Sequence, residues 1–202
     1  MELFSGESLT NLVRTAGYLG LFAIIFAESG LFIGFFLPGD SLLFTAGLLA
    51  SQGILNIYWL ILVLFVAAVT GDNVGYTFGR RVGHRIFKRE DSLLFHKNNL
   101  IRAENFYKQY GSMTIIIARF IPIVRTFAPI VAGVGKMEYK RFFTYNLIGG
   151  FLWTIVMTLS GFILVKIFPN IEHNLSLVVL IIIIVSVIQP AYHIIKERSK
   201  KS

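Results

Sequence analysis

Two arginines, Arg119 and Arg125, lie inside an apolar segment that extends from Met113 to Gly135. A guanidinium keeps its proton, and burying one at bilayer depth costs about 2.5 to 3.5 kcal/mol. Its planar fork of donors fits the oxygens of a phosphate. The two residues are therefore expected to point into a water-filled cavity and to have a function there. The alternative is that they reach the membrane surface, or pair with acids for a structural purpose alone.

Two acids, Glu28 and Asp40, interrupt the first apolar block. With the arginines they form a set of zero net formal charge, which a bound phosphate would make strongly negative. Because removal from water favours the neutral form of a carboxyl group, uptake of protons by these acids would relieve that charge. We expect Glu28 and Asp40 to couple transport to protons; the alternative is a static set of ion pairs with the arginines. Asp72 is a secondary candidate, which could cap a helix, pair with Arg80 or bind a cation.

Proline and glycine interrupt the apolar pattern beside both charged pairs. The sequence Pro38-Gly39 precedes Asp40, and Pro122 and Pro129 flank Arg125. Proline removes a backbone donor and obstructs a continuous helix. We therefore expect hairpin turns at Pro38, Gly39, Pro122 and Pro129, in two segments that are broken or re-entrant. Such backbone is tolerated at membrane depth where it faces protein or a water-filled cavity.

The whole chain has the composition of a polytopic membrane protein. Of its 202 residues 55% are hydrophobic, and they lie in long blocks. We predict an all-α fold that forms a single membrane domain over residues 1–202. The net charge of +8 is concentrated in loops beside apolar spans, which favours membrane orientation over nucleic-acid binding. The chain has no cysteine, which excludes disulfides and thiolate chemistry.

Hydrophobic blocks and basic clusters predict the order of the elements. The prediction is an interfacial helix in residues 1–16, a broken helix pair in 18–50, a span in 54–78, a cytoplasmic loop with an amphipathic surface helix in 80–112, a second hairpin in 113–135, a span in 142–168 and a C-terminal transmembrane helix in 175–195. Both flanks of the second hairpin are basic, so it should enter from the cytoplasm and return there. The C-terminal tail should also be cytoplasmic.

An internal repeat follows from the same sequence. Residues 17–28 resemble residues 108–119, with Glu28 and Arg119 at matching positions. The spacing from these charges extends the match to two pairs of glycines, Gly47 with Gly133 and Gly75 with Gly161. We assign the first repeat to residues 17–79 and the second to residues 108–168. Their hairpins would open to opposite sides, as in transporters built on inverted repeats.

An ordered set of motifs resembles the DedA family of bacterial inner-membrane proteins over residues 17–165. The set is Glu28-Ser29-Gly30, Phe36-Leu37-Pro38-Gly39-Asp40, Gly71-Asp72, Gly75-Tyr76, Gly79-Arg80, Arg119-Phe120, Pro122, Arg125-Thr126, Ala132-Gly133, Met137, Phe142, Asn146, Gly149 and Trp153. The resemblance implies two re-entrant hairpins that meet in the bacterial cytoplasmic membrane. It also implies a role in returning undecaprenyl phosphate, the lipid carrier of cell-wall synthesis, to the inner leaflet. The family's functional acids correspond to Glu28 and Asp40, and its arginines to Arg119 and Arg125.

Together with the charged residues, the resemblance implies a proton-coupled transporter of a polyprenyl phosphate or another anionic lipid, with the bilayer and protons as its further partners. A general phospholipid scramblase and a membrane-assembly factor stay open as alternatives, as does a homo-oligomeric state. An intramembrane lipid phosphatase is disfavoured, because no serine has an evident base and no histidine has an acid at a suggestive spacing. We expect no enzyme activity, cofactor or metal.

Overall fold

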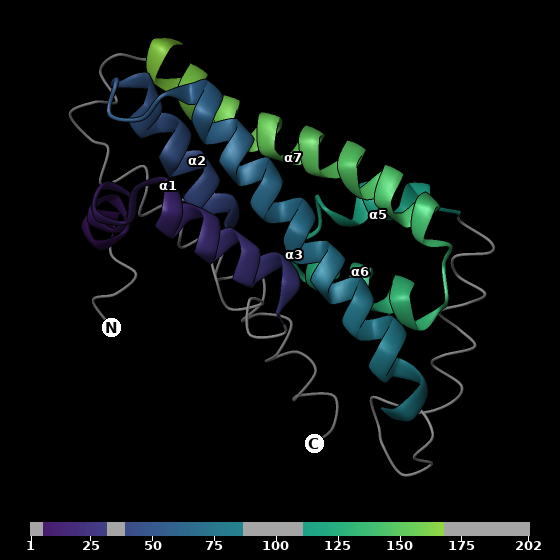
Figure 1. The fold of residues 1–202 in the computed structure, drawn as a ribbon. Coiled ribbons are helices and arrows are strands. Elements are labelled where there is room, and N and C mark those ends of the chain that lie inside the picture. The colour runs from purple at the N-terminus through teal and green to yellow at the C-terminus, as the bar shows by residue number, and fades with distance from the viewer. Residues whose placement is uncertain (1–5, 32–38, 87–110, 168–202) are drawn as a thin grey trace, which may run out of the picture. The chain divides into compact units, whose positions relative to one another are not determined.

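A computed structural model describes residues 6–31, 39–86 and 111–167, and these residues form α-helices without any strand (Figure 1). The helices are α1 (Gly6–Gly30), α2 (Gly39–Ser51), α3 (Ile57–Ile86), α5 (Met113–Ala118), α6 (Pro122–Val134) and α7 (Tyr139–Ile167). The predicted all-α class is confirmed. Pro38, most of the 80–112 loop and the predicted transmembrane helix in 175–195 lie outside the described residues.

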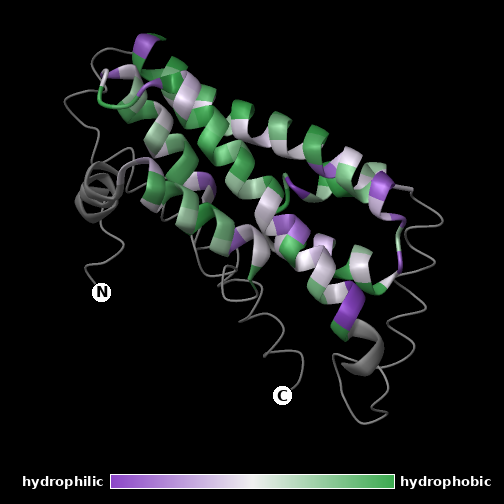
Figure 2. Ribbon diagram, viewed as in Figure 1, coloured by the Kyte–Doolittle hydropathy of each residue, from purple (hydrophilic) through white to green (hydrophobic). Residues whose placement is uncertain are grey.

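Two helices are long and apolar enough to cross a membrane, Ile57–Val82 within α3 and Tyr139–Ile167 in α7. They correspond to the spans predicted in residues 54–78 and 142–168. Figure 2 shows that both are mainly hydrophobic, with hydrophilic residues near the end of α3 and the start of α7. The side chain of Asn56 caps α3, because its Oδ1 accepts hydrogen bonds from the backbone N–H groups of Tyr58 and Trp59 at 3.0 and 3.3 Å.

Helix breaks occur at Gly17, just before the first predicted broken segment, and within both predicted segments. Gly17 divides α1 with a φ of 56°, a left-handed conformation that glycine adopts without steric cost. This break separates the helix expected in the first residues from the apolar block that follows. Helix α1 ends at Gly30 and α2 begins at Gly39. The predicted turn at Gly39 therefore coincides with the start of a helix.

The second segment breaks after Ala118, where α5 ends, and α6 begins with Pro122 as its first residue. Proline suits this position, since the first N–H of a helix has no partner within the helix. The predicted turn at Pro129 is wrong, because Pro129 lies inside α6. Its ring packs on α3, where its Cβ is 3.5 Å from the position that a Cβ at Gly75 would occupy. In membrane helices an internal proline is tolerated where neighbouring groups satisfy the backbone atoms that it frees.

The chain divides into two compact units. In the described residues, the first unit contains 6–22, 39–64 and 154–167. In this unit α2 crosses α7 at two glycines. A Cβ placed on Gly47 would lie 2.0 Å from the carbonyl oxygen of Thr158, and one on Gly161 would lie 2.0 Å from that of Phe44. Only glycine allows the two backbones to approach so closely.

The second unit contains residues 23–31, 65–86 and 111–153, and α6 crosses α3 in it. A Cβ on Gly133 would lie 2.1 Å from the carbonyl oxygen of Tyr76, and one on Gly79 would lie 2.1 Å from that of Ile130. The two crossings thus have the same local geometry. Gly133 makes the contact in this unit that Gly47 makes in the first, and Gly79 makes the contact that Gly161 makes. The assigned repeat, with its sequence match of Gly75 and Gly161, stays a prediction.

The core of the second unit joins its helices around Tyr76. This residue packs with Ile115 of α5, Ala132 of α6 and Phe142 of α7. Its ring stacks on Phe142 with 4.3 Å between centroids, and its hydroxyl donates a hydrogen bond to the carbonyl oxygen of Met137. These contacts hold α5 and α6 against α3 and α7. They thereby place the end of α5, where Arg119 lies, inside the unit.

The glycine crossing gives a first prediction. Replacing Gly79 with alanine should destabilise the protein by at least about 2 kcal/mol, because the new Cβ would collide with backbone that cannot move away. Gly75→Ala is the matched control one turn earlier, where the nearest atom, Ile130 Cγ1, is at 3.5 Å. Thermal unfolding of the purified variants measures the difference. Equal loss of stability in both variants would contradict the crossing.

Candidate functional site

Arg119 follows the last residue of α5, and its side chain is buried with 2% of its surface exposed. Its Nη2 donates hydrogen bonds to Asp72 of α3 and to Asn146 of α7. Asp72 is equally enclosed, at 1% exposed. One buried guanidinium therefore binds a carboxylate and a neutral amide, contributed by the two long helices.

Two glycines of α7 make room for this guanidinium. A Cβ on Gly149 would lie 3.1 Å from Arg119 Cδ and 3.4 Å from its Nε. A Cβ on Gly150 would lie 3.4 Å from Arg119 Nη1 and 3.0 Å from a methyl group of Val69. Any side chain at these positions would press on the arginine. The glycine pair thus allows the backbone of α7 to lie directly against Arg119.

Arg125 lies in the first half of α6 and is 4% exposed. Its Nη2 donates a hydrogen bond to the carboxylate of Glu28, near the end of α1. Its guanidinium lies over the ring of Trp153, with 4.5 Å from Cζ to the ring centroid, which is a cation–π contact. A second buried arginine therefore has an acid partner and an aromatic platform within the same unit.

The two ion pairs form one charged site. Asp72 interacts electrostatically with both Arg119 and Arg125, so the pairs are close enough to influence each other. Two guanidinium groups and two carboxylates give a net formal charge of zero. A buried ion pair gains little net stability, but removing one partner leaves an uncompensated charge. Replacing a carboxylate by another anion therefore costs less free energy than removing the carboxylate and leaving its arginine unpaired.

Several polar atoms of the site have no hydrogen-bond partner among the described residues. They are Arg119 Nε, Arg119 Nη1, Asp72 Oδ1 and Ser29 Oγ. Buried donors and acceptors are normally satisfied, so each such atom calls for an explanation such as a ligand, an ion or water. The arginine donors can bind oxygen atoms of an anion. Within the described ranges, no group of three or more His, Asp or Glu side chains is placed to hold a metal ion.

The structure brings together three of the four residues predicted to form the site: Arg119, Arg125 and Glu28. Asp40 lies in the first turn of α2, in the other unit, and its role stays a prediction. Asp72, which the sequence suggested only as a secondary candidate, is the acid bonded to Arg119. The suggested pairing of Asp72 with Arg80 is wrong, because Arg80 Nη1 instead donates a hydrogen bond of 2.8 Å to the hydroxyl of Tyr76.

Sequence reasoning assigned no role to the face of α7 that completes the site. Asn146, Gly149, Gly150 and Trp153 share this face, since they follow one another at helical spacing, and all four are buried. The sequence contains a signal for this face, because one polar residue, two glycines and one aromatic residue fall on the same side of an apolar helix. It indicates a face that binds a charge rather than packing against lipid.

The sequence was also compared with known proteins. Residues 37–163 match the VTT domain. The chain belongs to the VTT domain (DedA) family. The expected family is thereby confirmed. Within the VTT domain family, the chain is 44% identical to the protein DedA of Escherichia coli K12 over 195 residues, which cover 94% of this chain and 89% of that protein.

Two further relatives in the VTT domain family are named as membrane proteins. An uncharacterized membrane protein of Mycobacterium leprae is 39% identical over 180 residues, covering 88% of this chain and 80% of the relative. The inner membrane protein YqjA of Escherichia coli K12 is 38% identical over 153 residues, which cover 74% of this chain and 68% of that protein. No solved structure matches the chain. The family and the two apolar helices identify this chain as a membrane protein.

Proposed function

We propose that this protein carries a polyprenyl phosphate, such as undecaprenyl phosphate, across the bacterial cytoplasmic membrane. Arg119 and Arg125 bind the phosphate, and the polyprenyl chain stays in the lipid. Transport returns the carrier to the inner leaflet, where cell-envelope synthesis uses it again. The protein binds and moves its substrate without changing a covalent bond.

The observation that carries this proposal is the pair of buried arginines inside an apolar helical unit. Each is at most 4% exposed, and each is held by a carboxylate. A purely structural site would be better served by apolar residues, which often stabilise a core as well as a buried ion pair does. A retained guanidinium with open donors, as Arg119 has, is what recognition of a phosphate requires.

The acids supply the coupling to protons. When a phosphate dianion joins two arginines and two carboxylates, the site acquires a net charge of about −2. Protonation of Glu28 lowers that charge and frees Arg125 for the phosphate. Release of the proton restores the ion pair and expels the lipid. Asp40 is the second acid predicted for this step, from its place in the apolar block as well as from the family resemblance.

Inverted repeats provide the two access states. The crossing of α2 with α7 in one unit and that of α6 with α3 in the other have the same reciprocal glycine contacts. This equivalence supports a model in which each hairpin helix packs on the long helix of the other repeat. In inverted-repeat transporters, rocking or gating of one repeat against the other exposes one site to each side in turn.

Reconstitution tests the proposal. The purified protein is placed in liposomes with a fluorescent polyprenyl phosphate, and a membrane-impermeant quencher reports the leaflet that holds the probe. We expect leaflet transfer that a pH gradient accelerates. Equal transfer of phosphatidylcholine would indicate a general scramblase instead, and release of inorganic phosphate would indicate an enzyme. Absence of all three activities would leave a scaffold and refute the proposal.

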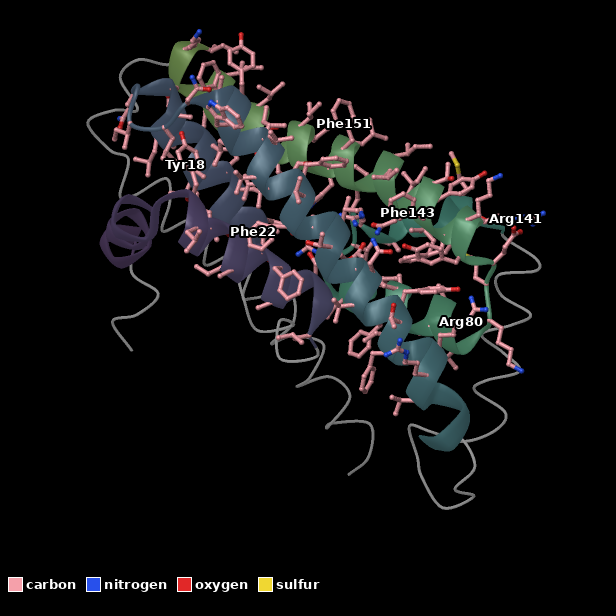
Figure 3. All side chains as sticks on the ribbon, in the orientation of Figure 1. Tyr18, Phe22, Arg80, Arg141, Phe143 and Phe151 are labelled. Atoms are coloured by element: carbon pink, nitrogen blue, oxygen red, sulfur yellow. The ribbon has the colours of Figure 1, made fainter. Side chains whose placement is uncertain are left out.

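The topology is a separate prediction. Exposed basic residues gather where α3 ends and α7 begins, and Figure 3 shows Arg80 and Arg141 there. By the positive-inside rule this end faces the cytoplasm, as does the C-terminal tail. Lys140→Cys in the otherwise cysteine-free chain should resist an impermeant thiol reagent in intact cells and react after lysis. Labelling of Lys140→Cys from outside would make the second hairpin a complete span.

A further inference from the structure

Asn146 is the neutral partner of the Arg119 guanidinium. It is fully buried, at 0% exposed, and its Oδ1 accepts a hydrogen bond from Arg119 Nη2. Its Nδ2 donates to the carbonyl oxygen of Val69 at 3.2 Å. Because these neighbours require oxygen on one side and nitrogen on the other, the orientation of the amide is fixed. Asn146 thus holds Arg119 without contributing charge.

The donors of Arg119 are unevenly used. A guanidinium presents two bidentate forks, Nε with Nη2 and Nη1 with Nη2. Asp72 and Asn146 both bind Nη2, whereas Nε and Nη1 have no partner in the part of the chain that the structure describes. Each fork is therefore half filled. If one group left Nη2, both donors of one fork would be available to two oxygen atoms of the same ligand.

The two groups on Nη2 differ in what their departure would cost. Removal of Asp72 would leave a buried guanidinium without its counter-charge, which is strongly unfavourable. Removal of Asn146 breaks neutral contacts and leaves the ion pair in place. The residues of α7 next to the open donors are Gly149 and Gly150, which add no side chain of their own there. An anion can approach backbone closely at such positions.

We propose that Asn146 is the exchangeable partner of Arg119. The phosphate of the lipid replaces the amide oxygen of Asn146 on Nη2 and binds the open donor next to it, while Asp72 stays bound to the arginine. This inference rests on the proposed function and adds a residue that determines specificity for an anion. A neutral side chain at position 146 admits a phosphate, and a negative one excludes it.

Three variants in zwitterionic phosphatidylcholine nanodiscs test this, with a polyprenyl monophosphate as the probe and native mass spectrometry as the binding measurement. Asn146→Ala should bind the probe as tightly as the parent or a few-fold more tightly, although it unfolds at a lower temperature. Asn146→Asp should bind it at least about tenfold more weakly, because the new carboxylate competes for the same donors. The matched control is Asn73→Asp on α3, which should bind within about twofold of the parent.

Asn73 is a fair control because its Nδ2 also donates to the carbonyl oxygen of Val69, at 2.7 Å, while its Oδ1 accepts from Tyr139 rather than from Arg119. If Asn146 exchanges with the phosphate, Asn146→Ala and Asn146→Asp should have different effects on binding. If Asn146 has only a structural role, both variants should bind the probe more weakly. Parallel loss in both folded variants, or unchanged binding in Asn146→Asp, overturns the inference. If Asn146→Asp does not fold, Asn146→Ala decides the question, since weaker binding there contradicts exchange. A parent protein that binds no probe refutes the proposed function itself.

Discussion

Replacing Arg119 with lysine should reduce lipid transport about tenfold or more while the chain still folds and inserts. Arginine offers five donors in one plane, and here Nη2 already binds Asp72 and Asn146 while two donors stay open. An ammonium group is a single point that can keep the ion pair with Asp72, but it cannot also present a fork to a phosphate. The liposome assay measures transport, and thermal unfolding verifies the fold.

Arg125→Lys should behave in the same way, because lysine also loses the planar contact with Trp153. Arg141→Lys is the control. Arg141 is 72% exposed and pairs only with Glu138 in the described contacts, at 3.3 Å, and Figure 3 shows it at the outer edge of α7. We expect parental transport in this variant. Normal transport in both Arg119→Lys and Arg125→Lys would mean that neither guanidinium recognises phosphate.

Removing the carboxylate of Asp72 should have the largest effect on stability. Asp72→Ala leaves the Arg119 guanidinium buried at 2% exposure without its counter-charge, and the free energy of unfolding should fall by about 3 to 5 kcal/mol. The exposed acid Glu138 provides the comparison. Glu138→Ala breaks an ion pair in water, so it should change the free energy of unfolding by less than about 1 kcal/mol. Unfolding in detergent, followed by heat or denaturant, measures both.

A double variant separates charge from packing. In Asp72→Leu with Arg119→Met, no uncompensated charge remains, so most of the stability lost in Asp72→Ala should return. Transport should stay absent, because the phosphate has lost its guanidinium. If the double variant is no more stable than Asp72→Ala, the loss comes from the cavity and not from the buried charge.

The blocks of apolar residues and the positions of glycine and proline were enough to predict the all-α fold class, the two long apolar helices and the helix break before Pro122. These features are local. A run of apolar residues needs lipid or protein around it whatever its partners are, and a proline imposes its conformation on its own neighbours. For the same reason the arginines could be recognised as site residues, since a charge in an apolar segment is costly wherever the chain places it. The turn predicted at Pro129 was wrong, because α6 continues through this residue, which packs on α3 beside Gly75.

Partner choice was decided only by the tertiary structure. From the sequence, Asp72 could pair with Arg80, but α3 presents it to Arg119, and Arg80 bonds Tyr76 instead. Asn146 and Trp153 had no assigned role until the fold laid α7 against the arginines. The physical reason is that an ion pair depends on which helix faces cross. Those faces are set by where backbones can approach, here at glycines whose carbonyl contacts involve residues far away in the sequence.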